Sequence, residues 1–149
     1  MQIPPAALDR LIARWPVGHL ATVGDHGHPH VVPVVFVLVD GIVWSPIDGK
    51  PKHGATLRRM ENLRRQPRCS LLLDHYAADW QALWWVRIDC SGAVLTFDAG
   101  APLVEHALRA KYPQYATIDP LPPPATLLEL RPIRHISWSA APVDWSSVA

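Results

Sequence analysis

Apolar residues recur at helical spacing near the start of the chain. In LDRLIARW (residues 8–15), the two leucines, the isoleucine and the tryptophan fall at positions i, i+3, i+4 and i+7, with charged residues between them. Pro16 and Gly18 follow, and proline and glycine commonly mark the end of a helix. The pattern therefore predicts an amphipathic helix within residues 1–17.

Apolar segments with strand character make up most of the chain from residue 18 to residue 139. Their order is HLATVG (19–24), VVPVVFVLV (31–39), IVW (42–44), CSLLLDHY (69–76), LWWVRIDCSGAVLTF (83–97) and TLLELRPIRHISWS (126–139). The second segment is apolar on both faces, which is typical of a strand covered on each side. Asp40 and Gly41, between the second and third segments, predict a two-residue type I′ hairpin turn.

The order of these segments favours an antiparallel sheet. Two further amphipathic helices are expected between strands, at residues 54–66 and 102–111. Regular alternation of strand and helix is missing, so a doubly wound parallel sheet is not expected. We predict one mainly-β domain over residues 1–149, in which a six-stranded antiparallel β-barrel with two inserted helices (18–139) follows the N-terminal helix and precedes an irregular tail (140–149).

Composition and charge narrow the classes of function. A chain of 149 residues leaves little room for a large enclosed pocket unless two subunits share one. The formal net charge of +1 gives no general attraction to nucleic acid or to an anionic membrane, and no apolar stretch is long enough to span a bilayer. The N-terminus does not have the pattern of a signal peptide. Two cysteines, far apart and outside any C-x-x-C motif, favour reduced thiols and a cytoplasmic location.

Three histidines alternate in DHGHPHVV, at residues 26, 28 and 30. In an extended chain all three would project from one face, as they would in a metal site. Metal sites usually add cysteine or carboxylate ligands at helical or knuckle spacing, and none converges here in the sequence. We therefore favour an exposed hairpin turn at Asp25-His26-Gly27 and predict no metal site.

Basic residues concentrate between residues 50 and 68, a segment that holds seven of the fourteen lysines and arginines. Lys50 and Lys52 immediately precede an expected helix, whose N-terminus offers free N–H groups and a partial positive charge. These two residues are therefore candidates for binding a phosphate or carboxylate. The segment matches no glycine-rich phosphate loop, and the chain contains no nucleophile motif, so any enzymatic chemistry would come from a bound cofactor.

Three of the seven tryptophans lie between residues 80 and 85. On a strand, Trp84 would share a face with apolar residues, whereas Trp85 would share the opposite face with charged ones. We expect Trp84 in the core, Trp85 at a subunit contact or pocket rim, and Trp80 in contact with a ligand or partner subunit. The alternative is that all three belong to the core.

Three motifs resemble the pyridoxamine 5′-phosphate oxidase-like split-barrel family, and in particular its members that use the deazaflavin coenzyme F420. They are LATV followed by G-x-PH-x-VPV-x-F, KPK followed by LRR-x-x-NLRRQPR, and LLLDHY-x-x-DW-x-x-LWWVR. The resemblance covers roughly residues 18–138. It implies a split barrel of the FMN-binding type that forms a homodimer and binds a flavin-like cofactor in two clefts at the subunit interface.

The resemblance also assigns residues to the cofactor. For the ring these are Val32, Pro33, Val34, Ser45 and Pro46, and for the anionic tail they are Lys50, Lys52 and Arg59. The chain lacks the C-terminal extension with which true pyridoxamine phosphate oxidases hold their substrate, so that activity is not expected.

The expected function is that of an F420-dependent oxidoreductase, which transfers a hydride between the reduced deazaflavin and a small organic acceptor. FMN is the alternative cofactor, and a non-catalytic protein that binds F420, a flavin or haem is the alternative function. His75, Tyr76 or an ordered water would supply a proton, and the sequence does not choose among them.

Overall fold

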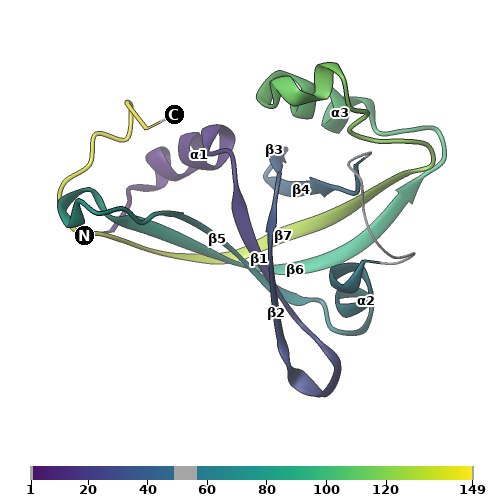
Figure 1. The fold of residues 1–149 in the computed structure, drawn as a ribbon, viewed down its shortest axis with the longest axis horizontal. Coiled ribbons are helices and arrows are strands. Elements are labelled where there is room, and N and C mark those ends of the chain that lie inside the picture. Colours follow the sequence, from purple (N-terminus) through teal and green to yellow (C-terminus); the bar gives the residue numbers. More distant parts are fainter. Residues whose placement is uncertain (1, 49–56, 149) are drawn as a thin grey trace.

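The structure, a computed structural model, describes residues 2–48 and 57–148 and centres on one antiparallel sheet (Figure 1). Its seven strands are β1 (Gly18–Val23), β2 (Pro29–Val34), β3 (Val37–Val39), β4 (Ile42–Pro46), β5 (Arg68–His75), β6 (Trp84–Phe97) and β7 (Ala125–Ser139). Their spatial order is β2-β1-β5-β6-β7-β4-β3. β6 and β7 are the longest strands, and they pair with each other from end to end.

The sheet does not close into a complete barrel. β2 and β3 are its two edges, and they are not paired with each other in the described part of the chain. β4 pairs with β7 only over residues 127–130, so the second half of β7 has β6 as its one partner among the described strands. This arrangement confirms the mainly-β, antiparallel split-barrel fold that the sequence predicts.

The prediction of six strands is wrong by one, because the apolar segment 31–39 forms two strands. Between β2 and β3, the backbone N–H of Phe36 donates to the hydroxyl of Tyr112 (3.0 Å). The carbonyl of Phe36 accepts a hydrogen bond from Nζ of Lys111 (2.9 Å). Buried backbone groups need hydrogen-bond partners, and here side chains provide them in place of a neighbouring strand. The ladder is therefore interrupted at this point.

The hairpin turn at Asp40 and Gly41 is confirmed. Their φ angles are 52° and 75°, and a type I′ turn requires positive φ at both central residues. Val39 and Ile42, on either side of the turn, are paired.

Three helices flank the sheet: α1 (Pro5–Arg14), α2 (Arg58–Arg65) and α3 (Pro102–Lys111). In Figure 1, α1 and α3 lie above the long strands and α2 lies below β6. α2 begins at Arg58 rather than at the expected residue 54, and residues 49–56 lie outside the described residues. Short 3-10 turns complete the described structure: η1 (Asp25–Gly27), η2 (Trp80–Ala82) and η3 (Pro113–Ala116). None of the described helices is long and apolar enough to cross a bilayer.

The core has two parts. The larger cluster lies between the sheet and α1 and includes Leu63 of α2. The smaller cluster contains Leu108 of α3, Tyr115 of η3 and Leu127 of β7. Burial of these side chains fixes α3 and the segment after it to one end of the sheet.

Both ends of the chain pack against Trp84, which is 2% exposed and occupies the core position that the sequence predicts. The ring centroid of Trp15, just after α1, lies 4.7 Å from that of Trp84. Trp145, in the C-terminal tail, has its ring 5.7 Å from Trp84 on an edge-to-face approach. The tail is irregular, as expected, but it is packed on the core.

Candidate functional site

A pocket of about 250 Å³ lies where β2, β4 and α2 approach one another, and we call it the Arg59 pocket. Its lining residues are Val17, Pro33, Val34, Val35, Ser45, Pro46, Asp48 and Arg59. Five of them, namely Pro33, Val34, Ser45, Pro46 and Arg59, belong to the nine residues that the sequence analysis names as candidates for cofactor binding. The structure therefore brings more than half of the predicted site together.

The ends of β2 and β4 form the apolar walls of the pocket. Ser45, near the end of β4, is 1% exposed. Its hydroxyl donates to the carbonyl of Val35 (2.8 Å), which joins β4 to the segment that follows β2. Because this hydroxyl proton is used within the protein, the walls present mainly aliphatic surface to a ligand.

Arg59 supplies the positive charge of the pocket. Burial lowers the pKa of its guanidinium, whereas the nearby carboxylate of Asp48 raises it. The side chain remains charged at neutral pH because arginine has an intrinsic pKa above 12. Its buried Nε–H has no hydrogen-bond partner among the described residues, and leaving a buried donor unsatisfied is costly. A phosphate or carboxylate would satisfy this donor, so the pocket suits a molecule with an anionic end and an apolar body.

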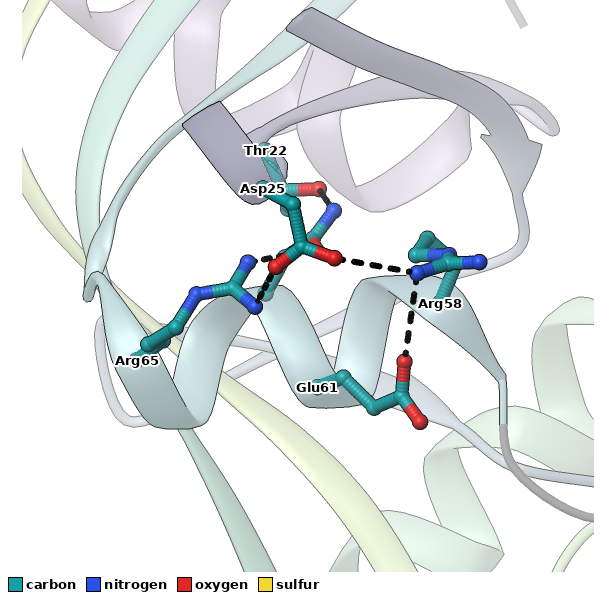
Figure 2. A network of polar contacts seen from close by, with 6 residues as sticks. Thr22, Asp25, Arg58, Glu61 and Arg65 are labelled. Carbon is teal, nitrogen blue, oxygen red and sulfur yellow. Dashed lines mark hydrogen bonds and ion pairs between the residues drawn. The ribbon is translucent and has the colours of Figure 1, made fainter. Parts of the chain in front are cut away.

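Other arginines of α2 hold the helix in place (Figure 2). Nη1 of Arg58 lies 3.5 Å from Oδ2 of Asp25, and Arg65 contacts the other oxygen of the same carboxylate. Between them, the buried amide of Asn62 donates to the hydroxyl of Thr22 on β1 (2.9 Å). Positions 58, 62 and 65 share one face of the helix, and this face is directed at β1 and the turn after it. Arg59 lies off that face and lines the pocket instead.

The other four candidate residues do not line the Arg59 pocket. Lys50 and Lys52 lie outside the described residues. Val32 packs against the larger core cluster and does not line the pocket. Trp80 is 75% exposed in η2, between β5 and β6.

Neither of the side chains considered as proton donors lines this pocket. His75 faces a separate cavity of about 420 Å³, which is also lined by Trp15 and Trp84. Tyr76 is 73% exposed.

The alternating histidines are dispersed. His26 lies in η1 and His28 directly follows it, and both are exposed, whereas His30 on β2 is partly buried. Within residues 2–48 and 57–148, no group of three or more histidine, cysteine, aspartate or glutamate side chains could hold a metal ion.

Three residues that line the pocket, Val17, Val35 and Asp48, are not among the candidates from the sequence, and neither is Tyr115, which contacts Asp48. Asp48 is 6% exposed and lines the pocket, and the hydroxyl of Tyr115 donates to its Oδ2 (2.6 Å). Burial and this carboxylate raise the pKa of Tyr115, so the phenol keeps its proton at neutral pH. The two residues are 67 positions apart, and Tyr115 lies in a proline-rich segment without periodicity. In the sequence, the one feature that points to Asp48 is its position just before the basic segment, in IDGKPK.

The fold and the pocket define a split β-barrel with a cleft suited to an anionic ligand. The family model of pyridoxamine 5′-phosphate oxidase matches residues 4–139 of this chain. The protein therefore belongs to the pyridoxamine 5′-phosphate oxidase family, as its motifs indicate.

Three solved structures share this fold at low sequence identity. An FAD-binding protein from Mesorhizobium loti is 18% identical with a TM-score of 0.68, and the match covers 92% of this chain and 95% of that one. The haem storage protein HutZ from Vibrio cholerae is 17% identical (TM-score 0.65, 93% and 95% covered), and an F420 reductase is 18% identical (TM-score 0.62, 90% and 98% covered). Identities this low establish the fold alone. No curated protein sequence matches this chain significantly.

Proposed function

We propose that this protein is an oxidoreductase that binds coenzyme F420 and transfers a hydride between the reduced deazaflavin and a small organic acceptor. The observation that carries the proposal is the buried Nε–H of Arg59, which has no partner in the described part of the chain and lies in a pocket with apolar walls. Membership of the pyridoxamine 5′-phosphate oxidase family supports it. The similarity in fold to an F420 reductase and to an FAD-binding protein supports it further.

The residues of the Arg59 pocket fit such a cofactor chemically. Arg59 would bind its phosphate or carboxylate end, and Lys50 and Lys52 remain candidates for the same role. Pro33 and Pro46 would pack against its flat ring system. When bound, the reduced cofactor supplies a hydride to an acceptor. The protein would contribute orientation and exclusion of water, and no side-chain nucleophile is required.

The proposal includes a homodimer with shared sites. The pocket of about 250 Å³ is smaller than the roughly 300–1,000 Å³ usual for ligand sites, so a second subunit would supply the remaining wall. The second half of β7 exposes Ile133, Ile136 and Trp138 (69%, 39% and 37% exposed). Apolar side chains gathered on one exposed strand are typical of an interface. In such a dimer, Trp80 would contact the ligand or the partner subunit.

FMN is the alternative cofactor, since it also combines a flat ring with a phosphate, and the similarity to the haem storage protein makes haem a ligand worth testing. Each ligand is added to the purified protein and its binding is followed by absorbance, where haem gives a Soret band. Micromolar binding of FMN without binding of the deazaflavin would overturn the choice of F420. Cofactor binding without turnover of a broad panel of acceptors would instead indicate a non-catalytic carrier.

The substitution Arg59→Gln tests the anion site. We expect the affinity for F420 to fall roughly tenfold or more, because hydrogen bonds to charged groups contribute about 1.5–3 kcal/mol. Arg58→Gln is the matched control. Arg58 is the neighbour of Arg59 in the sequence, but its side chain is 57% exposed and forms ion pairs with Asp25 and Glu61. Isothermal titration calorimetry measures both variants. Equal affinities for the wild type and Arg59→Gln would contradict the proposed site.

A further inference from the structure

A second cavity, which we call the tyrosine chamber, adjoins the Arg59 pocket. Its volume is about 270 Å³, and it lies between the segment before β1, the segment after β2 and the segment after α3. Its lining includes Val17, Val35, Gln114, Ile118 and the rings of Tyr112 and Tyr115. The two rings meet edge to face, with their centroids 5.9 Å apart.

The hydroxyl groups of both tyrosines are bound within the protein. The hydroxyl of Tyr112 accepts from the N–H of Phe36 (3.0 Å) and donates to the carbonyl of Pro16 (2.8 Å). The hydroxyl of Tyr115 donates to Asp48. Burial raises the pKa of Tyr112 to about 12, so its phenol is uncharged at neutral pH. Apart from the uncharged amide of Gln114, the chamber therefore presents ring carbon and aliphatic side chains, and none of its described lining residues carries a charge.

The two cavities differ in the charge that they accept. They meet at Val17 and Val35, which line both. Arg59 makes one of them attractive to an anion. The chamber has no such charge among its described lining residues, and the carboxylate of Asp48, which accepts from the hydroxyl of Tyr115, lines the Arg59 pocket instead.

We infer that the tyrosine chamber binds a neutral, apolar compound of one or two rings, and that this compound is the acceptor in the proposed reaction. Its assignment as an acceptor rests on the proposed function, whereas the binding itself does not. A charged group would lose its hydration in the chamber without gaining a partner. An apolar cavity of about 150 Å³ binds benzene, so a chamber of about 270 Å³ has room for a small bicyclic ring. Aromatic rings favour edge-to-face and offset contacts of the kind that Tyr112 and Tyr115 offer.

The test compares two probes with the same ring. The protein is titrated at pH 7 with 2-naphthol, which is neutral, and with 2-naphthoate, which is anionic. Binding in the chamber is read from the NMR signals of the Ile118 methyl groups, because Ile118 lines the chamber and not the Arg59 pocket. We expect 2-naphthol to shift these signals at concentrations at least tenfold lower than 2-naphthoate. Signals that do not move, or that respond equally to both probes, would overturn the inference.

Variants that fill the chamber provide the second measurement. Gln114→Trp and Ile118→Trp each place a large ring in the chamber, and we expect calorimetry to show at least a tenfold loss of 2-naphthol affinity. Thr117→Trp is the matched control, because Thr117 is an exposed neighbour that does not line the chamber. Its affinity should stay within twofold of the wild type. Gln114 is also exposed, so its replacement tests the chamber even if Ile118→Trp fails to fold. Unchanged affinity in Gln114→Trp would count against the chamber.

The variant Arg59→Gln separates this inference from the proposed function. We expect it to weaken cofactor binding and to leave 2-naphthol affinity within twofold of the wild type. If no deazaflavin or flavin binds while 2-naphthol still shifts the Ile118 signals, the proposed function fails and the chamber remains a binding site. If a cofactor binds and 2-naphthol does not, the inference of a binding site in the chamber is refuted and the proposed function remains.

Discussion

Lys111 connects three segments that are distant in the chain. Its Nζ donates to the carbonyls of Ile12 (3.0 Å) and Phe36 (2.9 Å) and lies 3.8 Å from the centre of the Phe36 ring. These contacts join α3 to α1 and to the break between β2 and β3. Burial nevertheless lowers the pKa of the Lys111 amine to about 7, because the charged form loses hydration.

This lowered pKa predicts a pH dependence of stability. In the unfolded chain Lys111 has its ordinary pKa of 10.5, so between pH 7 and about 10.5 the unfolded state binds a proton that the native state does not. The free energy of unfolding therefore rises with pH in this window. Lys111→Met lacks the amine and serves as the reference. Between pH 7 and pH 10, we expect the free energy of unfolding of the wild type to rise by about 1–3 kcal/mol relative to that of Lys111→Met.

Urea denaturation of both proteins at several pH values measures this difference. Below pH 7 the amine is protonated in both states, so the difference between the two proteins should level off there. Parallel stability curves across the whole range would show that Lys111 titrates normally in the folded protein.

Some residues of the Arg59 pocket can be predicted from the sequence, and others cannot. Arg59 could be predicted because it lies in the motif LRR-x-x-NLRRQPR, whose resemblance to the family assigns it to the anionic tail of the cofactor. Asp48 and Tyr115 could not, since their hydrogen bond joins positions 67 residues apart. Val17 and Val35 look like any other aliphatic residues until the fold brings them to the boundary of two cavities.

At the level of secondary-structure elements, α3 determines where β2 ends. The periodicity of the sequence is enough to place α3 at its observed bounds, Pro102–Lys111, because the amphipathic pattern is local. The division of residues 31–39 into two strands is not local. It depends on Tyr112, directly after α3, whose hydroxyl reaches the backbone of Phe36 across 76 positions. Nothing within the apolar segment itself indicates that break.

The substitution Tyr112→Phe tests this dependence. Removing the hydroxyl leaves the buried N–H of Phe36 without its acceptor, which we expect to cost about 1–3 kcal/mol of the free energy of unfolding. Tyr76→Phe is the control, because Tyr76 is 73% exposed and its change should have little effect. Chemical denaturation measures both proteins, and hydrogen exchange at Phe36 reports on the site directly. Equal stability of Tyr112→Phe and Tyr76→Phe would mean that another group satisfies Phe36.

At the level of the whole molecule, the incomplete barrel leaves one long strand partly uncovered. The second half of β7 has one strand partner in the part of the chain that the structure describes, and it carries Ile133, which is 69% exposed. Such strand edges are usually covered in native proteins. The proposed homodimer would cover this one.

The substitution Ile133→Lys tests the proposed interface. We expect the dissociation constant of the dimer to rise roughly tenfold or more, because a buried charge without a partner is costly. Leu103→Lys is the matched control, since Leu103 is 70% exposed and belongs to α3 rather than to β7. Sedimentation or light scattering measures the mass of each protein. A wild type that stays monomeric at micromolar concentration would remove the basis for shared sites.

The position of Trp84 has one further consequence, because the rings of Trp15 and Trp145 both pack against its indole. Segments near the two ends of the chain thus pack against one and the same ring. A protease that trims the tail would also loosen the first helix, and a fusion partner attached at either terminus would pull on the same ring.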